Sequence, residues 1–181
     1  LSLSATDTLL PVVPMFHVNA WGLPYSALAV GAKLVFPGPH LDGASLYNLF
    51  ETEQVTCSAG VPTVWQGLLA HVREKGLQFS SMKRTVIGGS ACPPAMIATF
   101  EDDYGVRVLH AWGMTELSPI GSVCVEKAKH RSASAADRRA LQSKQGRGVF
   151  GIDMKIVDGE GAELPWDGAS AGDLWVRGGW T

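Results

Sequence analysis

The sequence has few cysteines, no excess of charge of one sign and no long hydrophobic run. Its three cysteines are far apart and form no CxxC pair, and its five histidines are equally scattered. This spacing argues against a disulfide framework or a His/Cys metal site, and it fits a protein of the reducing cytoplasm. A net charge of −2 provides no basic surface for nucleic acid. Because no apolar run reaches the roughly 18 residues that a bilayer requires, we expect no membrane span.

What the sequence does contain is the composition of an ordinary globular protein. Hydrophobic residues make up 46% and charged residues 18% of its 181 residues. The chain begins LSLSATDTLL, without an initiator Met or a signal-peptide pattern, and it stops just after an apolar segment at residues 173–177. We therefore expect a central piece of a longer protein.

Short apolar runs alternate with amphipathic stretches along the first two thirds of the chain, as in βαβ units. The pattern predicts strands at residues 33–36, 56–59, 85–87 and 106–110. It predicts helices at residues 44–53, between Pro62 and Gly76, and from Pro93 to about Gly105. The second helix has the clearest signal, because six apolar residues share one face at helical spacing. The expected fold class is α/β, with a central, mostly parallel sheet flanked by helices.

The composition changes after residue 126, where charged and small residues dominate. We expect a surface helix at residues 135–144, a loop at 146–151, and strands at 154–157 and 173–177. These strands belong to the beginning of a second, smaller and β-rich unit. The predicted division is therefore residues 1–146 for the central α/β unit and residues 147–181 for the second unit.

Two predicted strand ends carry residues suited to nucleotide chemistry. Gly88-Gly89-Ser90-Ala91 follows one strand, and Ala111-Trp112-Gly113-Met114-Thr115-Glu116 follows the next. In open parallel sheets, ligands bind beyond the carboxyl ends of the strands. Trp112 offers a flat face for a purine, Thr115 a hydroxyl for phosphate, and Glu116 a hard oxygen ligand for Mg²⁺.

Simpler interpretations of the same residues stay open at this point. A Gly-Gly pair after a strand is usually a turn, a single Trp is usually core, and Thr-Glu is often the start of a helix. In the segment PMFHVNAWG, at residues 14–22, His17 can be a hydrogen-bonded core residue. Alternatively, it lies near the polar end of a pocket for an apolar substrate.

Four segments of the chain resemble a known family. HAWGMTELSP, GGSACPP, PMFHVNAWGLPY and AGDLWVRGGW look like the acyl-adenylate-forming superfamily, and most of all like its medium- and long-chain fatty acyl-CoA synthetases. They occur in the order of that family and span nearly the whole chain. The resemblance implies an ATP-dependent, AMP-forming acid–thiol ligase that uses Mg²⁺, a fatty acid and CoA.

The resemblance also implies roles for individual residues. Trp112 would stack on adenine, Thr115 would contact the α-phosphate, and Glu116 would bind Mg²⁺. By the same similarity, further residues line the adenine site, namely Gly89, Ser90, Ala91, Ala111 and Gly113. His17 would lie beside the carboxylate that is activated, and Trp21 would gate the fatty-acid tunnel. Val61 and Gly113 match positions of the acyl pocket. The catalytic residues implied are Thr115, Glu116 and His17.

Several family segments are missing from the 181 residues. There is no phosphate loop of the TSGTTGxPK kind, no ribose-binding Asp after the last strand and no C-terminal lid with its Lys. We therefore expect the chain alone to be inactive. An aryl-CoA ligase, another adenylate-forming enzyme and a non-catalytic binding domain of the same fold are the alternatives. The oligomeric state is open, with a homodimer as one candidate.

Overall fold

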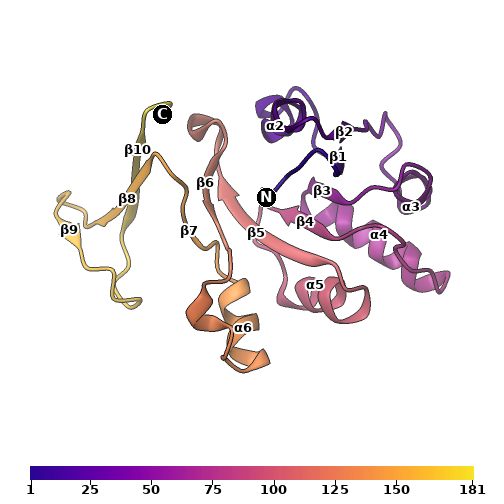
Figure 1. Cartoon of the computed structure of the whole chain (residues 1–181). Helices are drawn as coiled ribbons and strands as arrows, with labels where there is room; N and C mark the ends of the chain where they lie inside the picture. The colour runs from indigo at the N-terminus through magenta and orange to yellow at the C-terminus, as the bar shows by residue number, and fades with distance from the viewer.

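The computed structural model describes all 181 residues and contains two sheets (Figure 1). Strands of the larger sheet lie in the order β2-β1-β3-β4-β5-β6-β7. The parallel strands are β1 (Thr8–Pro11), β2 (Lys33–Leu34), β3 (Cys57–Gly60), β4 (Arg84–Ile87) and β5 (Arg107–Gly113). Two antiparallel strands extend it, β6 (Ile120–Val123) and β7 (Arg147–Gly148). The predicted α/β class with a mostly parallel sheet is confirmed.

Helices cover the two faces of this sheet unequally. One face carries α3 (Gly43–Thr52), α4 (Pro62–Glu74), α5 (Pro94–Ala98) and the π-helical turn η1 (Thr99–Asp103), over a core of 18 buried residues. The other face carries α1 (Val18–Trp21) and α2 (Leu23–Val30), over a cluster of only 9 buried residues. Neighbouring strand residues serve opposite faces, as with Val86 and Ile87, because side chains alternate along a strand.

The predicted helix after β3 is present as α4, and its apolar stripe is buried against the sheet. Pro62 occupies its first turn, where a missing N–H costs little, and Gly76 follows it with a φ of +64°. The side chain of Trp65 is fully buried in the core. A Cβ atom on Gly60 would lie 3.0 Å from the Trp65 ring, so the end of β3 can approach the helix closely.

Two sequence predictions about the large sheet need correction. The strand predicted at residues 106–110 continues to Gly113, because Ala111–Gly113 pairs with β6, a strand that the sequence did not reveal. The strand predicted at residues 33–36 is only two residues long.

The surface helix predicted at residues 135–144 is α6 (Ala135–Gln142), but the loop predicted after it contains β7. The smaller sheet has the order β10-β8-β9, with β8 (Ile152–Val157), β9 (Glu163–Leu164) and β10 (Asp173–Gly178). The change of sheet thus falls between Gly148 and Ile152, while the division at residues 146 and 147 stays a prediction. None of the helices is long and apolar enough to cross a bilayer.

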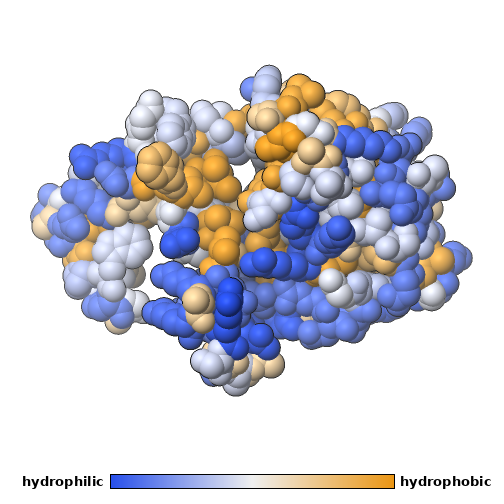
Figure 2. Space-filling view, in the orientation of Figure 1, coloured by the Kyte–Doolittle hydropathy of each residue, from blue (hydrophilic) through white to orange (hydrophobic).

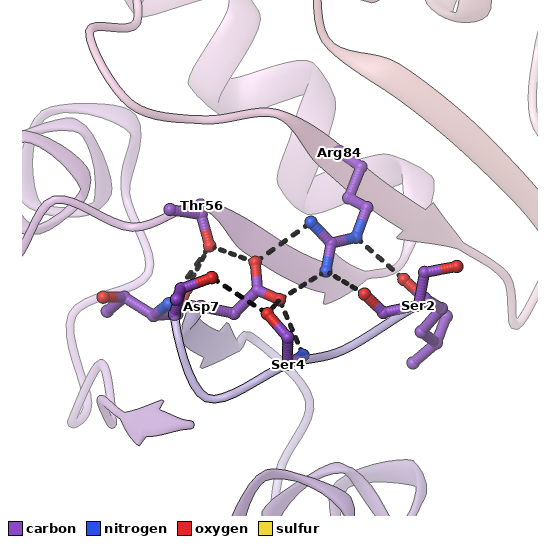
Figure 3. A network of polar contacts seen from close by, with 8 residues as sticks. Ser2, Ser4, Asp7, Thr56 and Arg84 are labelled. Atoms are coloured by element: carbon purple, nitrogen blue, oxygen red, sulfur yellow. Dashed lines mark hydrogen bonds and ion pairs between the residues drawn. The ribbon is translucent and has the colours of Figure 1, made fainter. Parts of the chain in front are cut away.

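A polar network fastens the first seven residues to the start of β4 (Figure 3). Arg84 donates two hydrogen bonds to the carboxylate of Asp7, at 3.0 and 2.9 Å, and both side chains are largely buried. Arg84 also donates to the carbonyl oxygens of Leu1 and Ser2, at 2.8 and 3.1 Å. The hydrogen bonds from Arg84 hold the pKa of Asp7 well below its ordinary value of 3.8.

Candidate functional site

A cleft of about 550 Å³ opens on the thinly covered face of the large sheet. One wall comes from α1 and α2, and the other comes from the ends of β4 and β5 with the turn that follows β5. Figure 2 shows apolar surface over α2 and mostly hydrophilic surface over α6. The cleft exists because α2 packs on the strands nearest to it and leaves the ends of β4 and β5 without a helix above them.

Gly88 and Gly89 are part of the cleft lining and have close neighbours. A Cβ atom on Gly88 would lie 3.0 Å from the Ala111 carbonyl oxygen and 3.5 Å from the indole of Trp21. A Cβ atom on Gly89, whose φ is +79°, would lie 2.9 Å from a methyl group of Val61. A side chain at either position would force these neighbours to shift, so glycine lets the loop after β4 pass close to Ala111 and Val61.

Trp112 lies on β5 itself rather than in a loop after it. Its ring packs against Gly121 of β6, where an added Cβ atom would be only 2.3 Å from the ring. Trp112 is partly exposed and lines the cleft together with Met114 and Ile120. An indole face at the edge of an open cleft suits the stacking of a flat ligand.

Thr115 and Glu116 lie on a 3₁₀ turn, η2 (Thr115–Leu117), directly after β5. Both side chains are exposed at the cleft, whereas that of Leu117 is fully buried and anchors the turn. Thr115 is not a helix cap, since Met114 occupies that position and no side chain caps the turn. Backbone hydrogen bonds close the loop, among them Met114 N–H to the Pro119 carbonyl at 2.8 Å.

Glu116 is the only carboxylate among the residues that line the cleft. The chain contains no group of three or more His, Cys, Asp or Glu side chains that could hold a metal ion by themselves. Mg²⁺ is commonly bound by one or two carboxylates and completes its shell with water and substrate phosphates. One exposed carboxylate at the cleft therefore fits a magnesium–nucleotide complex and does not fit an all-protein metal site.

The short element α1 is a left-handed turn that follows His17 and ends at Trp21. Val18, Asn19, Ala20 and Trp21 have φ values of 45°, 51°, 50° and 58°. Each L-residue in this conformation costs roughly 1–2 kcal/mol, so the packing around the turn must offset this cost. The turn places His17 at the exposed rim of the cleft and directs the indole of Trp21 over Gly88 and Gly89.

His110 is a buried residue near the site that the sequence did not single out. Its Nε2 accepts a hydrogen bond from the backbone N–H of Cys92 at 3.2 Å, and its Nδ1 donates to the carbonyl of Gln142 at 3.3 Å. Burial lowers the pKa of His110 below its ordinary value of 6.5. The neutral ring therefore joins β5, the loop after β4 and α6. A single scattered histidine gave no signal of this role.

The structure brings most of the predicted site residues together. The cleft is lined by His17, Trp21, Gly89, Ala111, Trp112, Gly113, Thr115 and Glu116. Val61 is in contact range of Gly89 but is not part of the lining, and Ser90 and Ala91 are exposed beyond it. Sequence reasoning missed other lining residues, among them Leu1, Leu23, Ser26 and Val86. Their side chains are apolar or neutral, so in the sequence they cannot be told from ordinary core or surface residues. The roles assigned to individual residues stay predictions.

A known protein family and individual relatives match this chain over its whole or nearly whole length. The family model described as AMP-binding enzyme covers residues 1–181. A medium-chain-fatty-acid–CoA ligase of Ectopseudomonas oleovorans is 57% identical over 181 residues, which are 100% of this chain and 33% of that protein. A 3-methylmercaptopropionyl-CoA ligase of Ruegeria lacuscaerulensis is 54% identical over 178 residues, which are 98% of this chain and 33% of that protein. The chain thus spans about a third of the length of these relatives.

A solved structure agrees with these sequence relatives. A long-chain-fatty-acid-CoA ligase from Archaeoglobus fulgidus superposes with a TM-score of 0.77 and 23% identity, over 97% of this chain and 35% of the other. At this level of identity the similarity concerns the fold alone. The family model and the sequence relatives confirm the predicted resemblance to acyl-CoA synthetases.

Proposed function

We propose that this chain, which belongs to the family of AMP-binding enzymes, forms the nucleotide- and acyl-binding part of a longer, ATP-dependent fatty acyl-CoA synthetase. The observation that carries the proposal is the content of a single cleft. It combines an indole face, one exposed carboxylate and an apolar inner wall. These three features suit adenine, a magnesium–phosphate group and an acyl chain, respectively.

The reaction has two steps with different nucleophiles. In the first, an oxygen of the fatty carboxylate bonds to the α-phosphorus of ATP, and the bond from that phosphorus to pyrophosphate breaks. In the second, the CoA sulfur attacks the acyl carbonyl, loses its proton and expels AMP. The main difficulty of the first step is electrostatic, because one anion must approach another. Catalysis of such transfers rests on positioning and charge stabilisation.

The residues of this chain act by binding and orienting the reactants. Trp112 stacks on adenine, and the bare backbone of Gly89 lets the nucleotide approach the floor of the cleft. Thr115 donates its hydroxyl to an α-phosphate oxygen, and Glu116 would hold Mg²⁺. Bound Mg²⁺ would supply positive charge that offsets the phosphates. His17, at the rim, orients the attacking carboxylate.

The apolar half of the cleft takes the acyl chain. Leu23, Val86 and Ile120 line it from three different elements, and Trp21 lines the same cleft. The relatives are named for medium-chain fatty acids and for 3-methylmercaptopropionate, which share a carboxylate on a narrow, flexible and apolar tail. We therefore infer a preference for flexible aliphatic acids over aryl acids. The three cysteines are free thiols, which suits the reducing cytoplasm.

The full-length protein that contains this chain, the parent protein, provides the test. We expect ATP–pyrophosphate exchange with decanoate, weaker exchange with benzoate, and little or none from the 181-residue chain alone. Replacing Glu116 by Ala should lower the exchange rate about 100-fold or more, as when a group that stabilises transition-state charge is lost. The matched control is Glu160→Ala, in an exposed turn of the smaller sheet, which should exchange normally.

Four outcomes would change the proposal. Near-normal exchange in Glu116→Ala would remove Glu116 from the mechanism, and robust exchange by the isolated chain would remove the need for the missing segments. Faster exchange with benzoate than with decanoate would make the parent protein an aryl-CoA ligase. Calorimetric binding of AMP without any exchange would leave only a non-catalytic binding domain.

A further inference from the structure

Trp180 connects the smaller sheet to the turn that carries Glu116. Its indole N–H donates a hydrogen bond to the carbonyl oxygen of Leu117 at 3.1 Å, although the two residues are 63 positions apart. The ring lies over Gly151, where an added Cβ atom would be 2.4 Å from it. Gly151 immediately precedes β8 of the smaller sheet, whereas Leu117 ends the turn between β5 and β6 of the larger sheet, and the indole of Trp180 contacts both.

The carbonyl of Leu117 accepts no backbone hydrogen bond inside this turn. Within the turn, the carbonyls of Met114 and Thr115 accept hydrogen bonds from Leu117 and Ser118 at 3.0 and 3.1 Å. The side chain of Leu117 is buried and packs near Gly121. Leu117 is therefore held at its buried side chain and also at its carbonyl oxygen, which accepts the hydrogen bond from the indole of Trp180.

The turn needs such support because its backbone is strained. Ser118 has a φ of +55°, in the left-handed region that residues with a side chain adopt at a cost. Glu116 itself is exposed, so its direction depends on the backbone of the turn rather than on neighbours of its side chain. A small rotation of the peptide after Glu116 would move the carboxylate relative to the cleft.

We infer that Trp180 is a positioning residue for Glu116, which it serves by holding the Leu117 carbonyl from the neighbouring sheet. This inference rests on the proposed function, since it concerns the carboxylate that is to hold Mg²⁺. Trp180 itself is not among the residues that line the cleft. Its effect is to make the smaller sheet part of the support of the nucleotide site.

The test measures the Mg²⁺ dependence of exchange in the parent protein. Trp180→Phe keeps an aromatic ring over Gly151 but removes the N–H donor. We expect the Mg²⁺ concentration at half-maximal rate to rise about three- to ten-fold, as when one neutral hydrogen bond is lost. The KM for decanoate should stay unchanged. The matched control is Trp175→Phe, because Trp175 lies on β10 with Lys155 over its ring and makes no bond to the turn.

A double variant separates positioning from general stability. In a Glu116→Gln background, Trp180→Phe should cause no further change in Mg²⁺ dependence, because the carboxylate that it positions is gone. A merely structural Trp180 would instead lower the unfolding temperature in both backgrounds and leave the Mg²⁺ concentration at half-maximal rate as it was.

Two results would overturn the inference alone. In the first, Trp180→Phe shows the Mg²⁺ dependence of the wild type, whereas Glu116→Gln shows an altered one. This result would leave the proposed function standing. The second result needs no variant and is measured on the wild-type parent protein by the exchange of indole N–H protons with solvent. Its Trp180 indole N–H should exchange with solvent at least ten times more slowly than that of Trp175, and equal rates would exclude the hydrogen bond. A wild-type parent protein without exchange would remove the proposed function and the inference together.

Discussion

Replacement of Asp7 by Asn is expected to destabilise the chain by about 3 kcal/mol, because breaking a buried ion pair costs about 3–5 kcal/mol. The side chains of Asp7 and Arg84 are 7% and 14% exposed, so solvent screens the pair little. The lower end of the range applies because Arg84 keeps the carbonyls of Leu1 and Ser2 as acceptors. Thr56 still meets the Asn side chain, as its hydroxyl lies 2.7 Å from the Asp7 carboxylate.

Urea unfolding of the chain, followed by tryptophan fluorescence at pH 7, measures this loss. Arg84→Met should cost a similar amount, since the Asp7 carboxylate retains donors from Ser4 and Thr56. The double variant should lose less than the two single losses added together, by about 2 kcal/mol. A loss below about 1 kcal/mol for Asp7→Asn, or strict additivity, would refute the pair as a stabilising contact.

The same pair predicts a pH dependence of stability. The folded state holds the pKa of Asp7 below 3.8, so as the pH falls below about 4 the unfolded chain takes up a proton first. The contribution of Asp7 is therefore fully present above that pH and is lost as the pH falls. The free energy of unfolding of the wild type should fall more steeply with acid than that of Asp7→Asn. Parallel curves would contradict the reasoning.

Two further substitutions test the site itself. Gly121→Ala places a methyl group within 2.3 Å of the Trp112 ring, so it should displace the indole and weaken AMP binding to the parent protein about ten-fold or more in calorimetry. Gly67→Ala, whose Cβ meets nothing within 4 Å, is the control and should bind normally. His110→Gln keeps one acceptor for Cys92 and one donor for Gln142. Because burial lowers the pKa of His110, wild-type stability should fall as the pH drops below about 6.5, and this variant should lack that part of the fall.

The sequence predicted best those elements whose signal is local. The apolar stripe of α4 and its flanking Pro62 and Gly76 specify the helix without help from the rest of the chain. The extension of β5 through Trp112 was missed because it depends on pairing with β6, which no pattern in those few residues reveals. The left-handed turn was missed because Val18 and Ala20 favour other conformations, and only the packed structure imposes positive φ on them.

The candidate site followed the same rule. Trp112, Thr115 and Glu116 were found because their residue types within five positions suggest a ligand, whereas Leu23 and Val86 were not, because apolar residues look alike wherever they pack. The contact of Trp180 with Leu117 joins residues too far apart in sequence for any local pattern.

Because helices cover the two faces of the large sheet unequally, substitutions on the two faces have different consequences. Val86 and Ile87 are adjacent in the chain, yet Ile87 belongs to the densely packed side and Val86 to the side with the cleft. A substitution at Ile87 bears mainly on whether the protein folds, and one at Val86 mainly on which molecule fits. Descendants of one ancestor can therefore diverge in the molecules that fit the cleft while inheriting the same scaffold.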